Sequence, residues 1–195
     1  MALQKNRLAP VLLISLLVMI DQAVKIIISR WFFDRCFGLV GDMLQFSPVH
    51  NTALSWVNSS LNLGIGFIPH LLLNAFLVVI VVLIYQYCKG KYAVGKGADA
   101  IFIFFIAGAL CSLIDKIFWP GSLDYIHLKG FFTFDLKDVY LTACEVLLVV
   151  LAIKYREAWH QVKLRQEARD FARYVYTNVC REKAKKIPRQ GHEYE

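Results

Sequence analysis

Charged residues are scarce in this sequence, and the residues that organise metal or disulfide sites are few and scattered. Asp, Glu, Lys and Arg make up 19% of the 195 residues, whereas 57% are hydrophobic and the mean hydropathy is +0.49. A soluble domain of this size needs more polar surface than that. The five cysteines include no C-x-x-C pair, so the sequence predicts neither a disulfide framework nor a zinc site. It also lacks the peptidase motifs H-E-x-x-H and G-x-S-x-G.

The apolar residues are concentrated in four blocks, at about Leu8–Ile28, Phe67–Tyr87, Ala98–Trp119 and Val139–Tyr155. The first three are long enough to cross a hydrocarbon core of ~30 Å at ~1.5 Å per residue. The fourth is short and gains length if it begins a few residues earlier. The pattern therefore predicts an all-α integral membrane protein with four transmembrane helices.

The first apolar block has a second interpretation as a cleaved signal peptide, because Lys5 and Arg7 precede it. However, the apolar run continues past Lys25, and no A-x-A-like cleavage site follows. We therefore expect a retained first helix.

Basic residues indicate the orientation of the predicted helices. They precede the first block, fill the connection between the second and third, and are abundant after the fourth. The positive-inside rule then places both termini in the cytoplasm, and the loops at about 29–66 and 120–138 on the outer side. The net charge of +7 is explained by this topology and by attraction to anionic lipid. No motif indicates nucleic-acid binding.

Two regions follow from this topology. Residues 1–155 form the predicted membrane domain. Its outer loop 29–66 has apolar positions and turn residues in Phe37–Trp56, which predict short strands and hence a small β-containing platform. Residues 156–195 form a basic cytoplasmic tail, predicted to be an amphipathic helix.

Carboxylates within membrane helices are rare because each is costly to bury. In the predicted topology Asp21, Asp115 and Asp138 reach a similar level near the outer face. Each also has a structural interpretation: Asp21 pairs with Lys25 at i, i+4, Asp115 packs between helices, and Asp138 caps a helix N-terminus. Glu145 lies deeper and is expected to be a packing partner.

Asp115 and Asp138 together predict a catalytic pair. Two close carboxylates do not both ionise cheaply, so one keeps its proton while the other acts as general base on a water. This chemistry hydrolyses a peptide without metal, cysteine or serine.

The motifs around these residues follow a recognisable order, namely Asp21-Gln22-x-x-Lys25, His50-Asn51-Thr52-Ala53, Gly108-Ala109-Leu110-x-x-Leu113-Ile114-Asp115-Lys116, Asp124-Tyr125 and Phe134-x-x-x-Asp138. From about Arg7 to Tyr155, this order resembles the lipoprotein signal peptidase (signal peptidase II) family. The resemblance implies a membrane-embedded aspartyl endopeptidase with Asp115 and Asp138 as its catalytic pair. It also implies that Asn51 positions the substrate.

The resemblance assigns supporting or substrate-binding positions to Asp21, Lys25, Ser112, Lys116 and Asp135. Three of these depart from the family pattern: Ser112 stands for Asn, Lys116 for Arg and Asp135 for Asn. In addition, Lys137 stands for Ala. Serine lacks the paired donor and acceptor of an amide, lysine lacks the bidentate geometry of arginine, and Asp135 adds a negative charge beside the pair.

The function implied is removal of the signal peptide from prolipoproteins, just before the diacylglyceryl-modified cysteine. The implied location is a bacterial inner membrane, with the active site near the outer face, membrane lipid as a partner, no cofactor or metal, and a monomeric protein. Two alternatives remain. One is a catalytically degenerate relative that binds lipoproteins. The other is a small proton-coupled transporter that uses Asp21, Asp115 and Glu145, although the sequence has no inverted repeat to support it.

Overall fold

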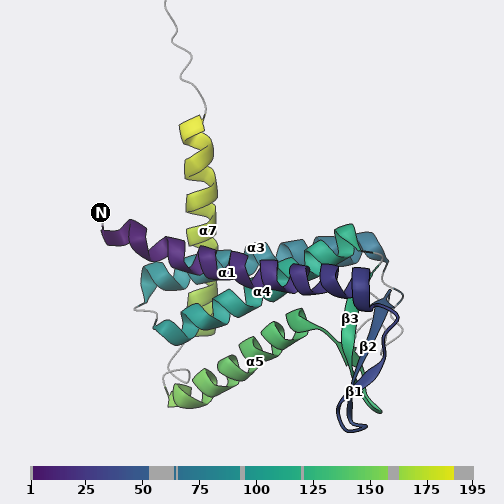
Figure 1. Ribbon diagram of the computed structural model, residues 1–195. Helices are drawn as coiled ribbons and strands as arrows, with labels where there is room; N and C mark the ends of the chain where they lie inside the picture. Colours follow the sequence, from purple (N-terminus) through teal and green to yellow (C-terminus); the bar gives the residue numbers. More distant parts are fainter. Residues whose placement is uncertain are drawn as a thin grey trace, which may run out of the picture.

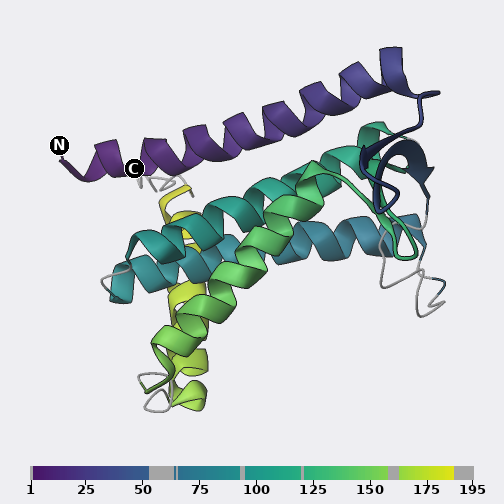
Figure 2. The ribbon, with the colours of Figure 1, turned by 60° about the horizontal axis from the view of Figure 1, so that its bottom comes forward.

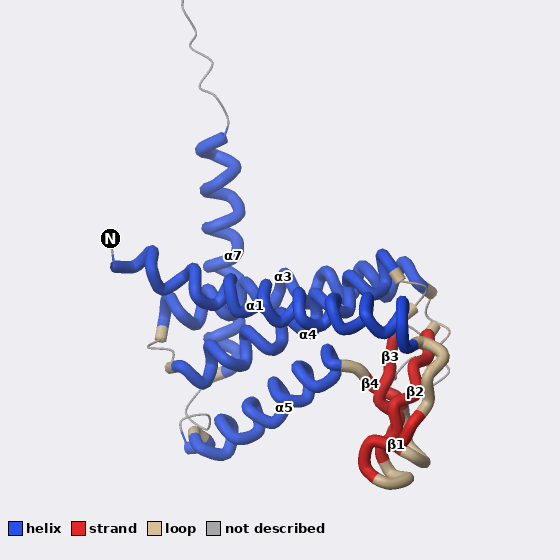
Figure 3. Tube along the Cα trace, viewed as in Figure 1, coloured by secondary structure: helices blue, strands red, loops and turns tan. Residues whose placement is uncertain are grey.

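The computed structural model describes residues 2–52, 64, 66–92, 95–119, 121–157 and 163–186. Long helices run side by side, and a small sheet lies at one end of them (Figure 1, Figure 3). The elements are α1 (Ala2–Ile27), the π-helical turn η1 (Ile28–Phe32), β1 (Phe37–Val40), β2 (Leu44–Asn51), α3 (Phe67–Lys91), α4 (Lys96–Phe118), β3 (Ser122–Leu128), β4 (Thr133–Phe134), α5 (Leu136–Lys154) and α7 (Leu164–Lys186).

Three helices in the described part of the chain are long and apolar enough to cross a membrane: Leu8–Phe32, Phe67–Lys91 and Lys96–Phe118, with hydropathies of 2.3, 2.7 and 2.2. They match the first three predicted spans. The predicted fourth span corresponds to α5, which has 19 residues and carries Lys137, Asp138 and Glu145. Because these charges reduce its apolar character, α5 is not among the candidate spans, and a fourth crossing stays a prediction.

Helix α4 is the centre of the bundle and contacts α1, α3 and α5. Its buried positions toward the sheet end are mostly small, including Ala107, Gly108 and Cys111. A Cβ on Gly108 would lie 2.8 Å from the side chain of Leu141 and 3.3 Å from the carbonyl oxygen of Lys137. Glycine therefore lets the first turns of α5 approach α4 closely.

The sheet has the antiparallel order β1-β2-β3-β4. Strands β1 and β2 come from the outer loop, which confirms the predicted β-containing platform there; the end of that segment, with Trp56, lies outside the described residues. Strands β3 and β4 lie between α4 and α5 and were not predicted. The β2–β3 register shifts between Phe46 and Val49, where Pro48 has no N–H to donate to the ladder.

A glycine lets the end of β2 and the start of β3 come close together. Gly121 has φ +98°, and a Cβ there would lie 2.4 Å from the carbonyl oxygen of Asn51. Only glycine accommodates this conformation and this approach. Asn51 consequently pairs with Ser122 in the ladder, and Asp124 follows two residues along β3.

The tail forms helix α7, which crosses the direction of the bundle (Figure 1). Lys91 at the end of α3 binds Glu167 at 2.8 Å and Asp170 at 2.9 Å, and the ring of Tyr87 contacts Phe171. The sheet lies at the opposite end, where α1 ends and α3 begins (Figure 2). In the predicted orientation that end is the outer one, and the cytoplasmic location of α7 stays a prediction.

Candidate functional site

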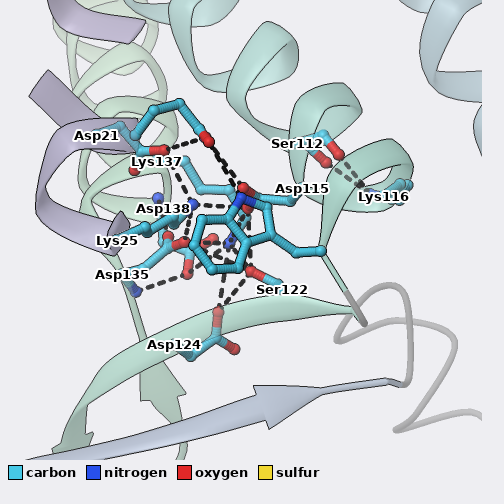
Figure 4. Close-up of polar contacts among 12 residues, drawn as sticks. Asp21, Lys25, Ser112, Asp115, Lys116, Ser122, Asp124, Asp135, Lys137 and Asp138 are labelled. Carbon is cyan, nitrogen blue, oxygen red and sulfur yellow. Dashed lines mark hydrogen bonds and ion pairs between the residues drawn. The ribbon is translucent and has the colours of Figure 1, made fainter. Parts of the chain in front are cut away.

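Seven charged side chains meet where α1, α4, β3 and the start of α5 come together (Figure 4). Five are carboxylates and two are ammonium groups. They are Asp21 and Lys25 from α1, Asp115 from α4, Asp124 from β3, Asp135 before α5, and Lys137 and Asp138 from the first turn of α5.

The first part of this cluster, called here the buried network, consists of Asp21, Lys25 and Asp115. Lys25 is 0% exposed, and its Nζ lies 2.9 Å from Asp21 Oδ2 and 2.6 Å from Asp115 Oδ2. Asp115 is 1% exposed, and its Oδ1 accepts a hydrogen bond from Gln22 at 3.1 Å. Both oxygens of Asp115 thus have donors. A buried ion pair with this many partners holds α1 against α4 and leaves little room for a reactant.

The start of α5 is fixed by a capping box. Asp135 accepts a hydrogen bond from the backbone N–H of Asp138 at 3.2 Å, and Asp138 Oδ2 accepts one from the backbone N–H of Asp135 at 3.1 Å. The N-cap is therefore Asp135, and the interpretation of Asp138 as the N-cap is wrong by three residues. The reciprocal bonds orient Asp138 and leave its Oδ1 outside the cap.

Asp135 is buried between the two lysines. Its Oδ2 lies 2.5 Å from Lys137 Nζ and 2.8 Å from Lys25 Nζ. Burial alone would raise the pKa of Asp135, but these two ammonium groups hold that pKa below its ordinary value. The two departures from the family pattern in this segment, Asp135 and Lys137, are thus partners of each other.

Asp124 is the carboxylate that ties the sheet to this cluster. It is 3% exposed. Its Oδ1 accepts a hydrogen bond from Ser122 Oγ at 2.8 Å and lies 3.3 Å from Lys137 Nζ, while its Oδ2 accepts one from Asn51 Nδ2 at 2.9 Å. Asn51 therefore contacts the cluster through Asp124, and its role in positioning the substrate stays a prediction.

Asp124 and Asp138 are called here the groove pair. One oxygen of each, together with one of Asp135, lies within 4.8 Å of the others. A water that bonds both carboxylates fits such a separation. Three clustered carboxylates also suit a cation, but the Lys137 ammonium already lies among them, and its charge opposes a metal ion there.

Asp138 opens onto an apolar groove. Its side chain is 40% exposed, in contrast to the buried Asp115. The groove has a volume of about 680 Å³, and its lining residues apart from Asp138 are uncharged: Phe104, Phe132, Phe134, Val139, Thr142, Ala143, Val146 and Leu147. An apolar segment that binds in this groove therefore contacts the carboxyl group of Asp138.

Ser112 and Lys116 bind each other instead of joining the cluster, and Figure 4 shows them to one side. Lys116 Nζ donates to Ser112 Oγ at 2.6 Å, and Asn74 Nδ2 donates to the same oxygen at 3.0 Å. Glu145 is exposed on α5, whereas Asp21 and Asp115 bind Lys25. These three carboxylates do not form a connected proton relay.

Three residues of the site were not among the predicted site residues: Asp124, Ser122 and Lys137. Asp124 belongs to a motif that the resemblance includes, and that was its only signal. Lys137 was marked only as a departure from the family pattern, and Ser122 had no signal. The roles of both depend on β3 pairing with β2 and on α5 packing beside α4.

The family model for "Signal peptidase (SPase) II" matches residues 13–154. A lipoprotein signal peptidase of Treponema denticola is 27% identical, with 75% of this chain and 90% of that protein covered. One of Borrelia hermsii is 28% identical, covering 70% and 81%. A solved bacterial membrane enzyme, determined by the in meso method at 2.3 Å resolution, shares the fold with a TM-score of 0.62 at 19% identity, covering 80% of this chain and 92% of that one.

Proposed function

This chain belongs to the signal peptidase II family, and on that premise we propose that it removes signal peptides from prolipoproteins by aspartyl catalysis. The substrate is a prolipoprotein with a diacylglyceryl-modified cysteine, cleaved just before that cysteine. The names of its relatives support this substrate class, and the apolar groove supports a lipidated one.

The groove pair carries the proposal. Asp124 and Asp138 have oxygens within 4.8 Å, and Asp138 faces the groove. One carboxylate is ionised and accepts a proton from the bridging water as that water attacks the scissile carbonyl carbon. The other is protonated and donates its proton to the carbonyl oxygen. When the tetrahedral intermediate collapses, the C–N bond breaks. The carboxyl group that took the proton of the water gives it to the leaving amine, and the other carboxylate takes a proton back from a hydroxyl group of the intermediate.

Hydrogen bonds from neighbouring groups orient both members of the groove pair. Asn51 and Ser122 donate to the two oxygens of Asp124, which fixes its orientation, and the capping box does the same for Asp138. The predicted pairing of Asp115 with Asp138 stays a prediction. The bonds of Asp115 to Lys25 and Gln22 support a structural role for it, and Asp124 rather than Asp115 belongs with Asp138 to the group of carboxylate oxygens that lie within 4.8 Å of one another.

The apolar groove supports entry of the substrate from the bilayer. Its apolar walls lie beside α4 and α5, so the helical signal peptide and its lipid enter from the bilayer without crossing water. We propose a bacterial inner membrane with the sheet end facing outward, both termini in the cytoplasm, and a monomer as the working unit.

The proposal is tested with purified full-length protein in detergent and a lipidated pre-lipoprotein, with release of the signal peptide followed by gel shift. We expect cleavage by the wild type and at least about a hundredfold loss in Asp138→Asn. Asp42→Asn is the control, because Asp42 is 91% exposed in an outer turn. Binding without cleavage by the wild type would support the degenerate lipoprotein-binding relative instead.

A further inference from the structure

Lys137 lies at the centre of the charged cluster although it stands on the first turn of α5. Its side chain is 10% exposed, and its Nζ is within ion-pair distance of four carboxylates, at 2.5 Å from Asp135, 3.3 Å from Asp124, 3.5 Å from Asp115 and 3.9 Å from Asp138. A lysine is rarely buried in this way unless it is fully paired. The four carboxylates satisfy this condition, so the question is what the charge of Lys137 does to them.

The two buried lysines serve different carboxylates. Lys25 binds Asp21, Asp115 and Asp135. Among the ion pairs of the described residues, Lys137 alone contacts both Asp124 and Asp138. The charge on Lys137 thus acts directly on the groove pair, whereas the charge on Lys25 acts on the buried network.

Lys137 also contacts a hydroxyl, which raises the question of a Ser–Lys nucleophile. Lys137 Nζ donates to Ser122 Oγ at 2.5 Å, and Ser122 Oγ donates in turn to Asp124 at 2.8 Å. An ammonium surrounded by four carboxylates keeps its proton, so it does not accept one from Ser122. The geometry favours an electrostatic role over a nucleophilic one.

We propose that Lys137 is a positioning residue that sets the pH range in which Asp124 and Asp138 share one proton. This role rests on the proposed peptidase function. The charged groups around the ammonium are those of the cluster and one further lysine: Asp21 and Lys25 on α1, Asp115 and Lys116 on α4, Asp124 on β3, and Asp135 and Asp138 at the start of α5.

The sign of the effect follows from charge. A positive charge close to two carboxylates favours their ionised forms, so both protons leave the pair at lower pH than they otherwise would. Without the ammonium, the state in which Asp124 and Asp138 share one proton is populated at higher pH. The acidic and alkaline limbs of the pH–rate profile both move upward when Lys137 loses its charge.

The experiment measures kcat/KM against pH for the purified full-length protein with a lipidated pre-lipoprotein. We expect Lys137→Met to shift both limbs upward by about one pH unit or more. Lys137→Arg keeps the charge and should restore the wild-type limbs. Lys129→Met is the matched control, since Lys129 is 63% exposed and contacts Asp42 at 3.8 Å; it should leave the profile unchanged.

Lys137→Gln provides a second neutral variant that keeps a donor for Asp135 and Ser122, in case the methionine variant does not fold. A folded neutral variant with the wild-type profile would overturn the role of Lys137, as would an arginine variant that shifts as far as the neutral ones. If both neutral variants fail to fold, Lys137 is structural and the proposal is also overturned. An inactive wild type would instead overturn the proposed function on which this role rests.

Discussion

The buried network and the groove pair lie in one cluster but differ in what surrounds them. In the buried network, Lys25 is 0% and Asp115 1% exposed, and both oxygens of Asp115 accept hydrogen bonds. In the groove pair, the side chain of Asp138 is 40% exposed and faces an apolar groove. Asp124 is also buried and accepts hydrogen bonds at both oxygens, so the two regions differ in Asp138, whose exposed carboxyl group is available to a water and a substrate.

The largest effect is expected when the second member of the groove pair, Asp124, is neutralised. Asp124→Asn keeps the shape of the side chain but removes its proton chemistry, so kcat should fall by about 10²–10⁴-fold. The thermal midpoint should fall as well, because Lys137 loses one buried carboxylate partner, but Lys137 keeps Asp135, so the protein should still fold and turnover is measured per folded molecule. A single-turnover cleavage assay measures the loss, and near-normal turnover in this variant would contradict the assignment of Asp124.

The second test concerns Asp115. Asp115→Asn leaves Lys25 short of one partner in a buried ion pair, which should destabilise the protein by about 3 kcal/mol. Turnover per folded molecule should stay within about tenfold of the wild type. Thermal unfolding and cleavage are measured on the same preparation. A stable but inactive variant would support the sequence-based pairing of Asp115 with Asp138 over the groove pair.

A third, smaller effect is expected in the groove itself. Ala143→Phe places a ring among the lining residues, so KM for the lipidated substrate should rise about tenfold or more while kcat changes less. Leu148→Phe is the matched control, because Leu148 is on the same helix, 50% exposed, and not a lining residue. Equal KM values for the two variants would argue against substrate binding in this groove.

The smallest effect should come from Ser112, which lies apart from both regions. Ser112→Ala removes a hydroxyl that accepts from Lys116 and Asn74, at a cost of about 1 kcal/mol in stability. Cleavage should remain within about threefold of the wild type, because no bond from Ser112 reaches the groove pair in the described residues. A large loss of kcat would show that the contacts of Ser112 with Lys116 and Asn74 affect the groove pair.

The sequence predicted the long helices of this protein better than it predicted which side chains contact each other. The apolar blocks predicted the first three long helices, and the scarcity of buried carboxylates drew attention to Asp21, Asp115 and Asp138. However, the choice of Asp115 as the partner of Asp138 rested on depth along a helix and on the family resemblance, and neither measures the distance between two side chains. Depth does not reveal that Lys25 and Gln22 occupy Asp115, nor that Asp124 reaches the same place from a strand.

The same limit applies to the departures from the family pattern. Along the chain, Asp135 is an added negative charge and Lys137 an added positive charge two residues later, with nothing to show that they meet. In three dimensions the two carboxylates Asp135 and Asp124 flank the Lys137 ammonium, so the added charges compensate each other.

The sequence by itself determined the membrane helices, the family and the presence of costly carboxylates near one end of the bundle, because hydropathy and charge act locally along the chain. Only the tertiary structure decided which carboxylates face each other. That outcome depends on the β2–β3 pairing at Gly121, the close approach of α5 to α4 at Gly108, and the capping box that turns Asp138 toward the groove. These are contacts between segments far apart in the chain, which no local pattern encodes.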